Sequence, residues 1–174
     1  MKTLVIVSHP YPEQSHAIKA LEQAVKTVPD VEIRNLESLY GQDLNSFDIQ
    51  AEQAAHNTAD RVIYMFPVHW FNLTPMLKAY MNSVWTYGWA FGPEGTALKD
   101  KQFQVVATAG ATEFTYSPEG VIECTMDEVL SPLKASAKYV GMNYLKPIAF
   151  FEAMGADESK TELFQETLIA ALSK

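Results

Sequence analysis

Residues 61–85 read RVIYMFPVHWFNLTPMLKAYMNSVW, and this stretch decides the fold. Val62 to Phe66 is a continuous apolar run, which is typical of a strand buried on both faces of a parallel sheet. Pro75 suits the first turn of a helix, where its missing N–H needs no partner, and Thr74 before it is a good N-cap. The stretch therefore predicts a strand, an aromatic loop over residues 67–73, and a helix from Pro75 to about Trp85.

The loop between that strand and helix places His69, Trp70 and Phe71 in a row. In open α/β folds, ligands bind at the loops that follow the carboxyl ends of the strands. We therefore expect a ligand at this loop. An aromatic cluster that only anchors the loop is the alternative that these residues leave open.

The rest of the chain alternates strand and helix patterns. Further strands are predicted at 3–7, 31–36, 103–107 and 144–151, and further helices at 15–26, 48–58, 124–140 with a possible second portion from Pro132, and 159–172. Strands separated by helices predict parallel pairing with right-handed crossovers. The order fits one domain over residues 1–174 with a flavodoxin-like α/β fold, whose five-stranded parallel sheet has the order 2-1-3-4-5.

Composition narrows the classes of function. The 174 residues are 48% hydrophobic, as in a globular domain, and 13 basic against 21 acidic side chains give a net charge of −8. This charge argues against nucleic acid as a partner. Cys124 is the single cysteine, so no internal disulfide can form,. No apolar segment approaches the length of a membrane span, and the first apolar run is too short for a signal peptide. We expect a cytoplasmic protein without membrane insertion.

Three loops should meet at one edge of such a sheet. In the order 2-1-3-4-5 the switch point lies between the first and third strands. The loops after the first, third and fourth strands then gather there, and they span residues 8–15, 67–73 and 108–116. All three contain unusual polar or aromatic residues, which favours a ligand site.

Four motifs carry a family resemblance. They are Ser8-His9-Pro10 with Ser15-His16-Ala17, Phe66-Pro67-Val68-His69-Trp70-Phe71 joined to Pro75-Met76-Leu77-Lys78, Gly88-Trp89-Ala90-Phe91-Gly92, and Thr108-Ala109-Gly110-Ala111. In this order, over essentially the whole chain, they resemble the flavodoxin-like NAD(P)H:quinone reductases of the DT-diaphorase type. They are most similar to the short bacterial branch, which includes the ancillary quinone reductase of potassium efflux systems.

The resemblance implies an NAD(P)H dehydrogenase (quinone) with a non-covalent flavin, FMN with FAD as the alternative. Hydride would pass from NAD(P)H to the flavin and then to a quinone, in a two-electron ping-pong reaction. The resemblance also implies a homodimer, with Met76, Tyr80 and Trp85 shared between core and interface. We expect the stretch from Tyr87 to Phe91 to wall the face of the flavin where the substrates stack.

The resemblance also implies a role for each part of the site. The flavin phosphate would bind at the start of the first helix, where free N–H groups and the helix dipole favour an anion. The phosphate-binding residues would be His9, Ser15, His16, Ala17 and Ile18. The residues along the flavin ring would be Pro67, Val68, His69, Trp70 and Phe71. The residues whose amides face N1 and O2 would be Thr108, Ala109, Gly110 and Ala111.

Tyr116 matches the family's tyrosine near the O2 edge of the flavin and is the candidate catalytic residue. In the animal enzyme a histidine accompanies this tyrosine, but Ile122 occupies the corresponding position here. We therefore expect a hydrogen bond from Tyr116 and no proton relay.

Other functions are compatible with the same fold. One is a regulatory subunit that binds a potassium efflux channel, and another is an azo- or nitroreductase with the same cofactor. A one-electron flavodoxin is a third, against which the aromatic loop at 67–73 argues.

Overall fold

The computed structural model describes residues 1–173. At its centre is a parallel sheet in the order β2-β1-β3-β4-β5, and β6 also pairs with β4. The strands are β1 Thr3–Val7, β2 Val31–Asn35, β3 Arg61–Pro67, β4 Gln102–Thr108, β5 Asn143–Tyr144 and β6 Ile148–Phe150. The predicted flavodoxin-like strand order is therefore confirmed.

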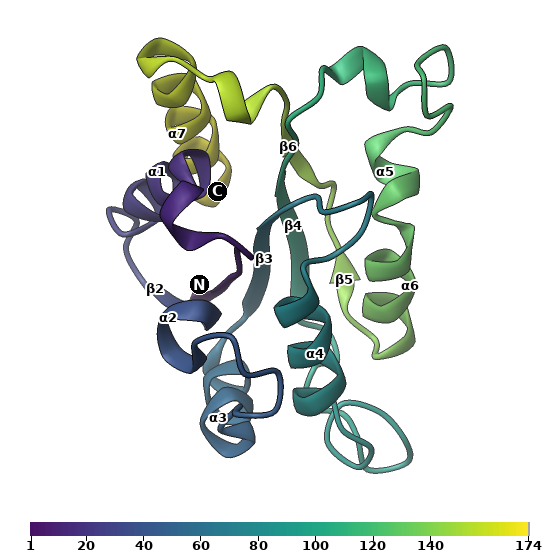
Figure 1. The fold of residues 1–174 in the computed structure, drawn as a ribbon. Helices are drawn as coiled ribbons and strands as arrows, with labels where there is room; N and C mark the ends of the chain where they lie inside the picture. The colour runs from purple at the N-terminus through teal and green to yellow at the C-terminus, as the bar shows by residue number, and fades with distance from the viewer. Residues whose placement is uncertain (174) are drawn as a thin grey trace.

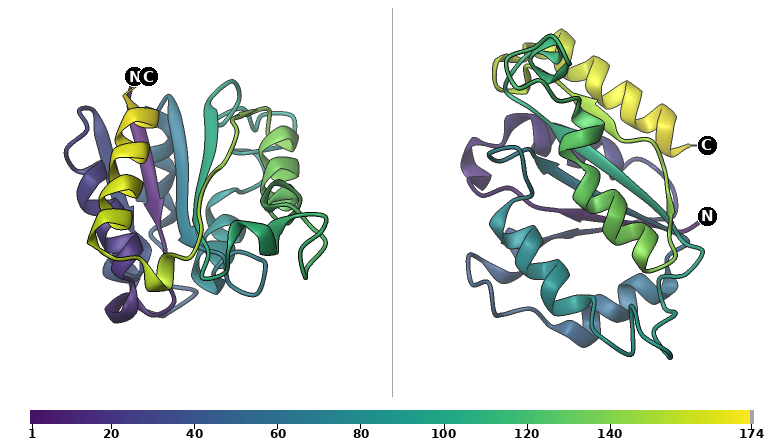
Figure 2. Two further views of the ribbon diagram at one scale, coloured as in Figure 1. Left: turned by 90° about the horizontal axis from the view of Figure 1, so that it is seen from above. Right: turned by 90° about the vertical axis from the view of Figure 1, so that its right-hand side faces the viewer.

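Helices cover both faces of the sheet (Figures 1 and 2). The α-helices are α1 His16–Val25, α2 Leu36–Tyr40, α3 Ile49–Thr58, α4 Pro75–Val84, α5 Met126–Val129, α6 Ser131–Tyr139 and α7 Glu158–Leu172. Short 3-10 turns are η1 Pro12–Gln14, η2 Glu113–Tyr116 and η3 Ala153–Gly155. Helices α1 and α7 pack on one face of the sheet, while α3, α4 and α6 pack on the other.

Strand β3 lies in the middle of the core. Tyr64 and Phe66 point into the cluster under α4, and Ile63 and Met65 point into the cluster under α1 and α7. All four side chains are at most 1% exposed. Burying each of them contributes roughly 1.5–3 kcal/mol. The apolar run that predicts a doubly covered strand is thus accounted for by the two helical layers.

Helix α4 begins as predicted. The Oγ1 of Thr74 accepts a hydrogen bond from the N–H of Leu77 at 3.2 Å, and Pro75 occupies the first turn. This cap fixes where the loop after β3 ends. The cap therefore also fixes the length of the loop that is available to a ligand.

The last predicted strand is not continuous. Residues 144–151 are predicted as one strand, whereas β5 ends at Tyr144 and β6 begins at Ile148. Pro147 lies between them, and a proline has no N–H to donate to the ladder. Both pieces still pair in parallel with β4, so the order of the sheet is unaffected.

Two helical segments also differ from prediction. The predicted helix 124–140 is two helices, because α5 ends at Val129 and α6 begins at Ser131, next to Pro132. The short helix α2 was not predicted. Asn35 ends β2 and caps α2 at once, since its side chain accepts the N–H of Ser38 at 3.1 Å. No helix in residues 1–173 is both long and apolar enough to cross a membrane.

Candidate functional site

The loop after β1 leads into α1 and leaves its polar groups available. Ser15 occupies the N-cap position and is buried, but its side chain does not cap the helix. The first N–H groups of a helix have no partner inside it. Those of His16, Ala17 and Ile18 therefore lie at the positive end of a ten-residue helix beside a free hydroxyl. This arrangement suits an anion such as a phosphate.

The loop after β3 is a tight turn with two aromatic residues at its tip. The backbones of His69 and Asn72 exchange two hydrogen bonds, of 2.9 and 3.1 Å. Trp70 and Phe71 between them have φ values of 49° and 59°. This left-handed conformation costs a non-glycine residue roughly 1–2 kcal/mol. Strained backbone of this kind tends to cluster at binding sites, and here it exposes 86% of Trp70.

The loop after β4 lies directly beside that turn. The N–H of Val68 donates to the carbonyl of Thr108 at 2.8 Å, and the N–H of Ala109 donates to the carbonyl of Phe150 at 2.9 Å. The amide of Ala109 is thus committed to the sheet and is not a free donor, which differs from its predicted role. The amides of Gly110 and Ala111 have no such bond within residues 1–173.

Tyr116 closes the same side of the site. Its ring lies 6.0 Å from that of Phe71 and 5.5 Å from that of Phe151, between centroids. Burial raises the pKa of the Tyr116 hydroxyl above its usual range. The hydroxyl therefore keeps its proton at neutral pH and can donate a hydrogen bond. Nothing in these contacts gives it a partner for proton relay.

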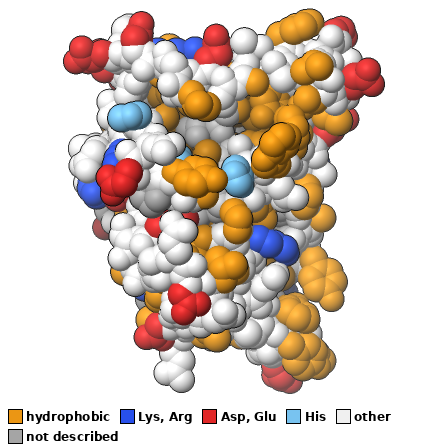
Figure 3. Space-filling view, viewed as in Figure 1, with side chains coloured by type: hydrophobic (Ala, Val, Ile, Leu, Met, Phe, Trp, Pro, Cys, Tyr) orange, Lys and Arg blue, Asp and Glu red, His pale blue; other side chains and the backbone are white. Residues whose placement is uncertain are grey.

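Three contacts join the three loops to one another. The Oγ atoms of Ser8 and Thr74 are 2.6 Å apart, the rings of Tyr11 and His69 meet edge-on at 6.3 Å, and Phe71 contacts Tyr116. The predicted gathering at one edge of the sheet is confirmed. Exposed apolar side chains occur in or near these loops, among them Tyr11, Trp70, Phe71, Phe114 and Met154. Figure 3 shows hydrophobic side chains gathered on one face of the molecule.

His9 is a neutral donor in this setting. Its Nδ1 accepts the N–H of Tyr11 at 3.0 Å, which leaves the ring proton on Nε2,. Burial lowers the pKa of His9, and nearby His69 and Lys19 lower it further. His9 therefore offers an anion an N–H group and no positive charge at neutral pH.

Glu37 is a site residue that sequence reasoning missed. The Ser8 hydroxyl donates to its Oε1 at 2.8 Å, and its Oε2 is buried without a hydrogen-bond partner among residues 1–173. Burial raises the pKa of this carboxyl. Glu37 also lines a cavity of about 330 Å³, whose other lining residues include His9, Ser15, Lys19, Glu22 and Ser38. No motif marks Glu37, because it follows an edge strand whose pattern is only alternating.

The stretch from Tyr87 to Phe91 lies at the opposite end of the strands from the three gathered loops. The indole N–H of Trp89 donates to the side chain of Asn57, near the end of α3 and the start of β3. Figure 1 shows this loop at the far end of α4 from the segment that joins α4 to β3. The prediction that it walls the ligand face is wrong within one chain, because α4 reverses the direction of β3.

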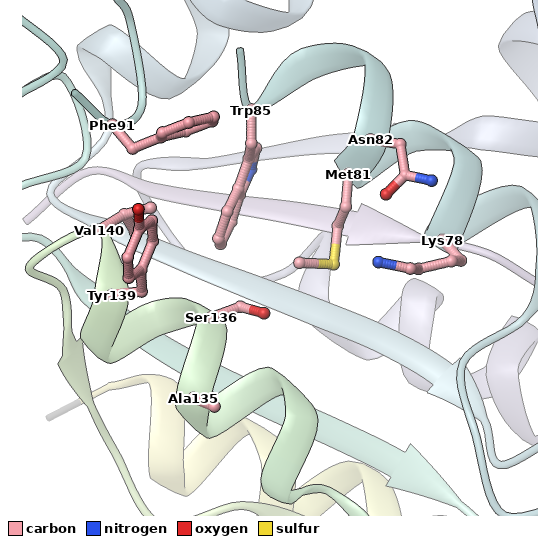
Figure 4. Close-up of a pocket in the computed structure, with 9 residues that line it drawn as sticks. All are labelled: Lys78, Met81, Asn82, Trp85, Phe91, Ala135, Ser136, Tyr139 and Val140. Carbon is pink, nitrogen blue, oxygen red and sulfur yellow. The ribbon is translucent and has the colours of Figure 1, made fainter. Parts of the chain in front are cut away.

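A second concave region lies between α4 and α6. This groove of about 660 Å³ is lined by Lys78 and Met81 at one end and by Trp85, Phe91 and Tyr139 at the other (Figure 4). Of the three residues predicted to be shared with an interface, only Trp85 lines it. Met76 is 4% exposed, and Tyr80 is fully buried with its hydroxyl donating to Glu52 at 2.8 Å. Within residues 1–173 no cluster of potential metal ligands occurs.

Comparison with known proteins agrees with this geometry. Residues 1–173 match the family described by its flavodoxin-like fold, and the chain belongs to that family. An uncharacterized NAD(P)H oxidoreductase of Bacillus subtilis (strain 168), YdeQ, is 37% identical over 153 residues, which are 88% of this chain and 77% of the relative.

Three solved structures share the fold. General stress protein 14 of Treponema denticola, in complex with FMN, has a TM-score of 0.92 and 34% identity over 99% of this chain and 98% of its own. A thermophilic tryptophan halogenase from Streptomycin violaceusniger has a TM-score of 0.93 and 33% identity over 98% of both chains. An NADPH-quinone reductase from P.pentosaceus, at 24% identity and a TM-score of 0.88 over 98% of this chain and 97% of its own, compares in fold alone.

Proposed function

We propose that this protein is an NAD(P)H oxidoreductase that binds FMN at the gathered loops and reduces quinones. One observation carries the proposal. Direct contacts between Ser8 and Thr74, Tyr11 and His69, and Phe71 and Tyr116 unite the three loops. A family member named as an NAD(P)H oxidoreductase supports the reaction class, and a relative in complex with FMN supports the cofactor.

The residues present fit a flavin mononucleotide. The start of α1 offers unpaired N–H groups, the Ser15 hydroxyl and the Nε2–H of His9 to a phosphate. The strained turn offers apolar surface from Trp70 and Phe71 to a planar ring. Gly110 and Ala111 offer free amides to the polar edge of that ring. FAD stays an alternative, for which the cavity beside Glu37 would have to hold the second nucleotide half.

Each part of the chain then has a physical task. When bound, the flavin supplies the hydride chemistry, accepting from NAD(P)H and donating to the quinone. The amides of Gly110 and Ala111 and the hydroxyl of Tyr116 stabilise negative charge that develops at the polar edge. The rings of Phe71, Tyr116 and Phe151 exclude water from one side of that edge.

The test uses the purified protein reconstituted with FMN. Anaerobic NADPH or NADH should bleach the yellow colour, and menadione should restore it. Ser15→Ala should weaken FMN binding without changing the melting temperature of the flavin-free protein, because the Ser15 side chain makes no cap bond. Protein that takes up neither FMN nor FAD would refute the proposal.

The acceptor and the partners follow from the resemblance. Azo and nitro compounds would use the same site, so steady-state rates on a panel of acceptors decide the substrate class. A homodimer would cover the groove between α4 and α6, where Tyr139 is 76% exposed, and sedimentation velocity tests this. A potassium efflux channel is the proposed protein partner in the cytoplasm, and co-purification with the channel's cytoplasmic domain tests it.

A further inference from the structure

A fourth segment of the chain lies against the loop after β4 and is held there by backbone hydrogen bonds. The N–H of Glu152 donates to the carbonyl of Ala111, and the N–H of Ala153 donates to the carbonyl of Ala109, both at 2.9 Å. The start of η3 is therefore fixed beside the amides that are proposed to bind the flavin. Met154 is the next residue, so the position of its backbone does not depend on its own flexible side chain.

Met154 differs from the other methionines in its exposure to solvent. It is 92% exposed, and Met1 is 53% exposed. The remaining five methionines are at most 7% exposed, and they are Met65, Met76, Met81, Met126 and Met142. Met1 precedes β1 and therefore lies at the amino ends of the strands, away from the gathered loops. An oxidant in solution thus has access to one methionine beside the proposed site and to one remote from it.

The sulfur of Met154 lies against the backbone of Gly110. A Cβ at Gly110 would be 3.0 Å from this sulfur and 3.4 Å from the Cγ of the same side chain. The N–H of Gly110 has no backbone hydrogen-bond partner within residues 1–173. It is also one of the two amides that are proposed to bind the polar edge of the flavin. A strong acceptor on the sulfur would therefore compete with the flavin for this N–H.

Oxidation of a methionine creates such an acceptor. The thioether sulfur accepts hydrogen bonds only weakly, whereas a sulfoxide is polar and carries an oxygen. With hydrogen peroxide as the oxidant, one oxygen atom passes to Sδ. The O–O bond of the peroxide breaks and an S–O bond forms, so the sulfur is oxidised by two electrons and the other oxygen leaves as water. Sulfoxide reductases reverse the change.

We propose that Met154 is a site of reversible oxidation by peroxide, and that its sulfoxide oxygen accepts the N–H of Gly110 and so weakens flavin binding. The effect on the flavin rests on the proposed function, whereas the modification and the contact with Gly110 do not. Loss of one hydrogen bond to the flavin should lower its affinity roughly two- to tenfold.

Peptide mapping of flavin-free protein treated with hydrogen peroxide tests the modification. Mass spectrometry should find sulfoxides at Met154 and Met1, while the five buried methionines keep their thioethers. A buried methionine that is oxidised as fast as Met154 would overturn the inference, because exposure would then not select the site. An unreactive Met154 would overturn it as well.

Amide hydrogen exchange at Gly110, measured by NMR without any flavin, tests the contact. In the wild type this N–H should exchange more slowly after oxidation, because it gains an acceptor. Met154→Leu is the control, since leucine has a similar volume and no sulfur. This variant keeps Met1 and the exposed Cys124, so effects of their oxidation occur in both proteins. Unchanged exchange at Gly110 in the oxidised wild type would overturn the inference.

Titration with FMN tests the consequence for the flavin. Peroxide should weaken FMN binding to the wild type but not to Met154→Leu, and sulfoxide reductases should restore the wild-type affinity. Met154→Gln, which carries a carbonyl acceptor, should bind FMN as weakly as the oxidised wild type does. Equal losses in wild type and Met154→Leu would overturn the inference and keep the flavin. Slower exchange at Gly110 without FMN binding to any form would support the modification and overturn the proposed cofactor.

Discussion

The ring of Phe71, in the loop after β3, lies 6.0 Å from the ring of Tyr116, after β4. The two residues are distant in sequence, and their contact closes the site on the side of the sheet where β4 lies. Phe71 contacts Tyr116 from within the turn at 69–72, where its φ is 59°. The strain in that turn and the packing of Tyr116 are therefore parts of one arrangement.

The ring of Tyr116 should contribute more to the stability of the fold than its hydroxyl does. Tyr116→Ala removes contacts with Phe71 and Phe151 and should lower the free energy of unfolding by roughly 3 kcal/mol,. Tyr116→Phe should leave it nearly unchanged but weaken FMN binding several-fold. Urea unfolding and FMN titration measure the two effects. Equal stability losses in both variants would contradict the assignment of the hydroxyl to the cofactor.

Replacing Trp70 by asparagine should increase the stability of the fold. It is 86% exposed and has a φ of 49°, a conformation that asparagine tolerates better,. Trp70→Asn should raise the free energy of unfolding by about 1 kcal/mol while weakening FMN binding. Phe114→Asn is the control, because Phe114 is 66% exposed but has no positive φ. A destabilised Trp70→Asn would show that the turn is not strained.

Two glycines near the site should respond differently to alanine. A Cβ at Gly120 would lie 2.0 Å from the carbonyl oxygen of Phe114, which is backbone and cannot yield easily. A Cβ at Gly110 would meet only the flexible side chain of Met154, with its sulfur at 3.0 Å and its Cγ at 3.4 Å. Gly120→Ala should therefore cost about 2 kcal/mol or more, and Gly110→Ala about 0.5 kcal/mol or less. Thermal unfolding of the two variants decides this, and equal losses would contradict it.

Buried His56 should make the fold sensitive to acid. Burial lowers its pKa to about 4, and its Nε2 has no hydrogen-bond partner in the described chain. In the unfolded chain a histidine titrates near pH 6.5. Between these values the unfolded state binds more protons, so stability falls as the pH falls from about 6.5 to 4. The loss should be on the order of 3 kcal/mol.

Urea unfolding at pH 7.5 and 4.5 measures this effect. His56→Asn should lose much less stability on acidification than wild type does. His16→Asn is the control, since His16 is exposed. Identical acid sensitivity in wild type and His56→Asn would assign the effect to other groups.

The fold could be predicted from the sequence because its signals are local. The apolar run of β3, the cap at Thr74 and the proline at Pro75 each decide one element without help from the rest. The split between β5 and β6 could have been found from Pro147. Helix α2 could not be predicted from the sequence, because Asn35 is both the last residue of β2 and the N-cap of α2.

The site was only partly predictable. The loops could be placed by strand order, but hydrogen bonds between distant residues could not. Glu37 lies 29 residues from Ser8 in the sequence, and Thr74 lies 66 residues from it. No periodicity links the three residues. Within one chain the stretch from Tyr87 to Phe91 lies away from the gathered loops, because a crossover helix returns the chain to the amino ends of the strands of a parallel sheet. A wall supplied by a second subunit stays a prediction.

A crystal structure of the protein grown with FMN tests the central proposal most directly. We expect the phosphate at the start of α1, within hydrogen-bond distance of Ser15 and His9, and the ring between the 67–73 loop and Gly110. A flavin in the groove between α4 and α6, or a phosphate remote from Ser15, would contradict the proposed site.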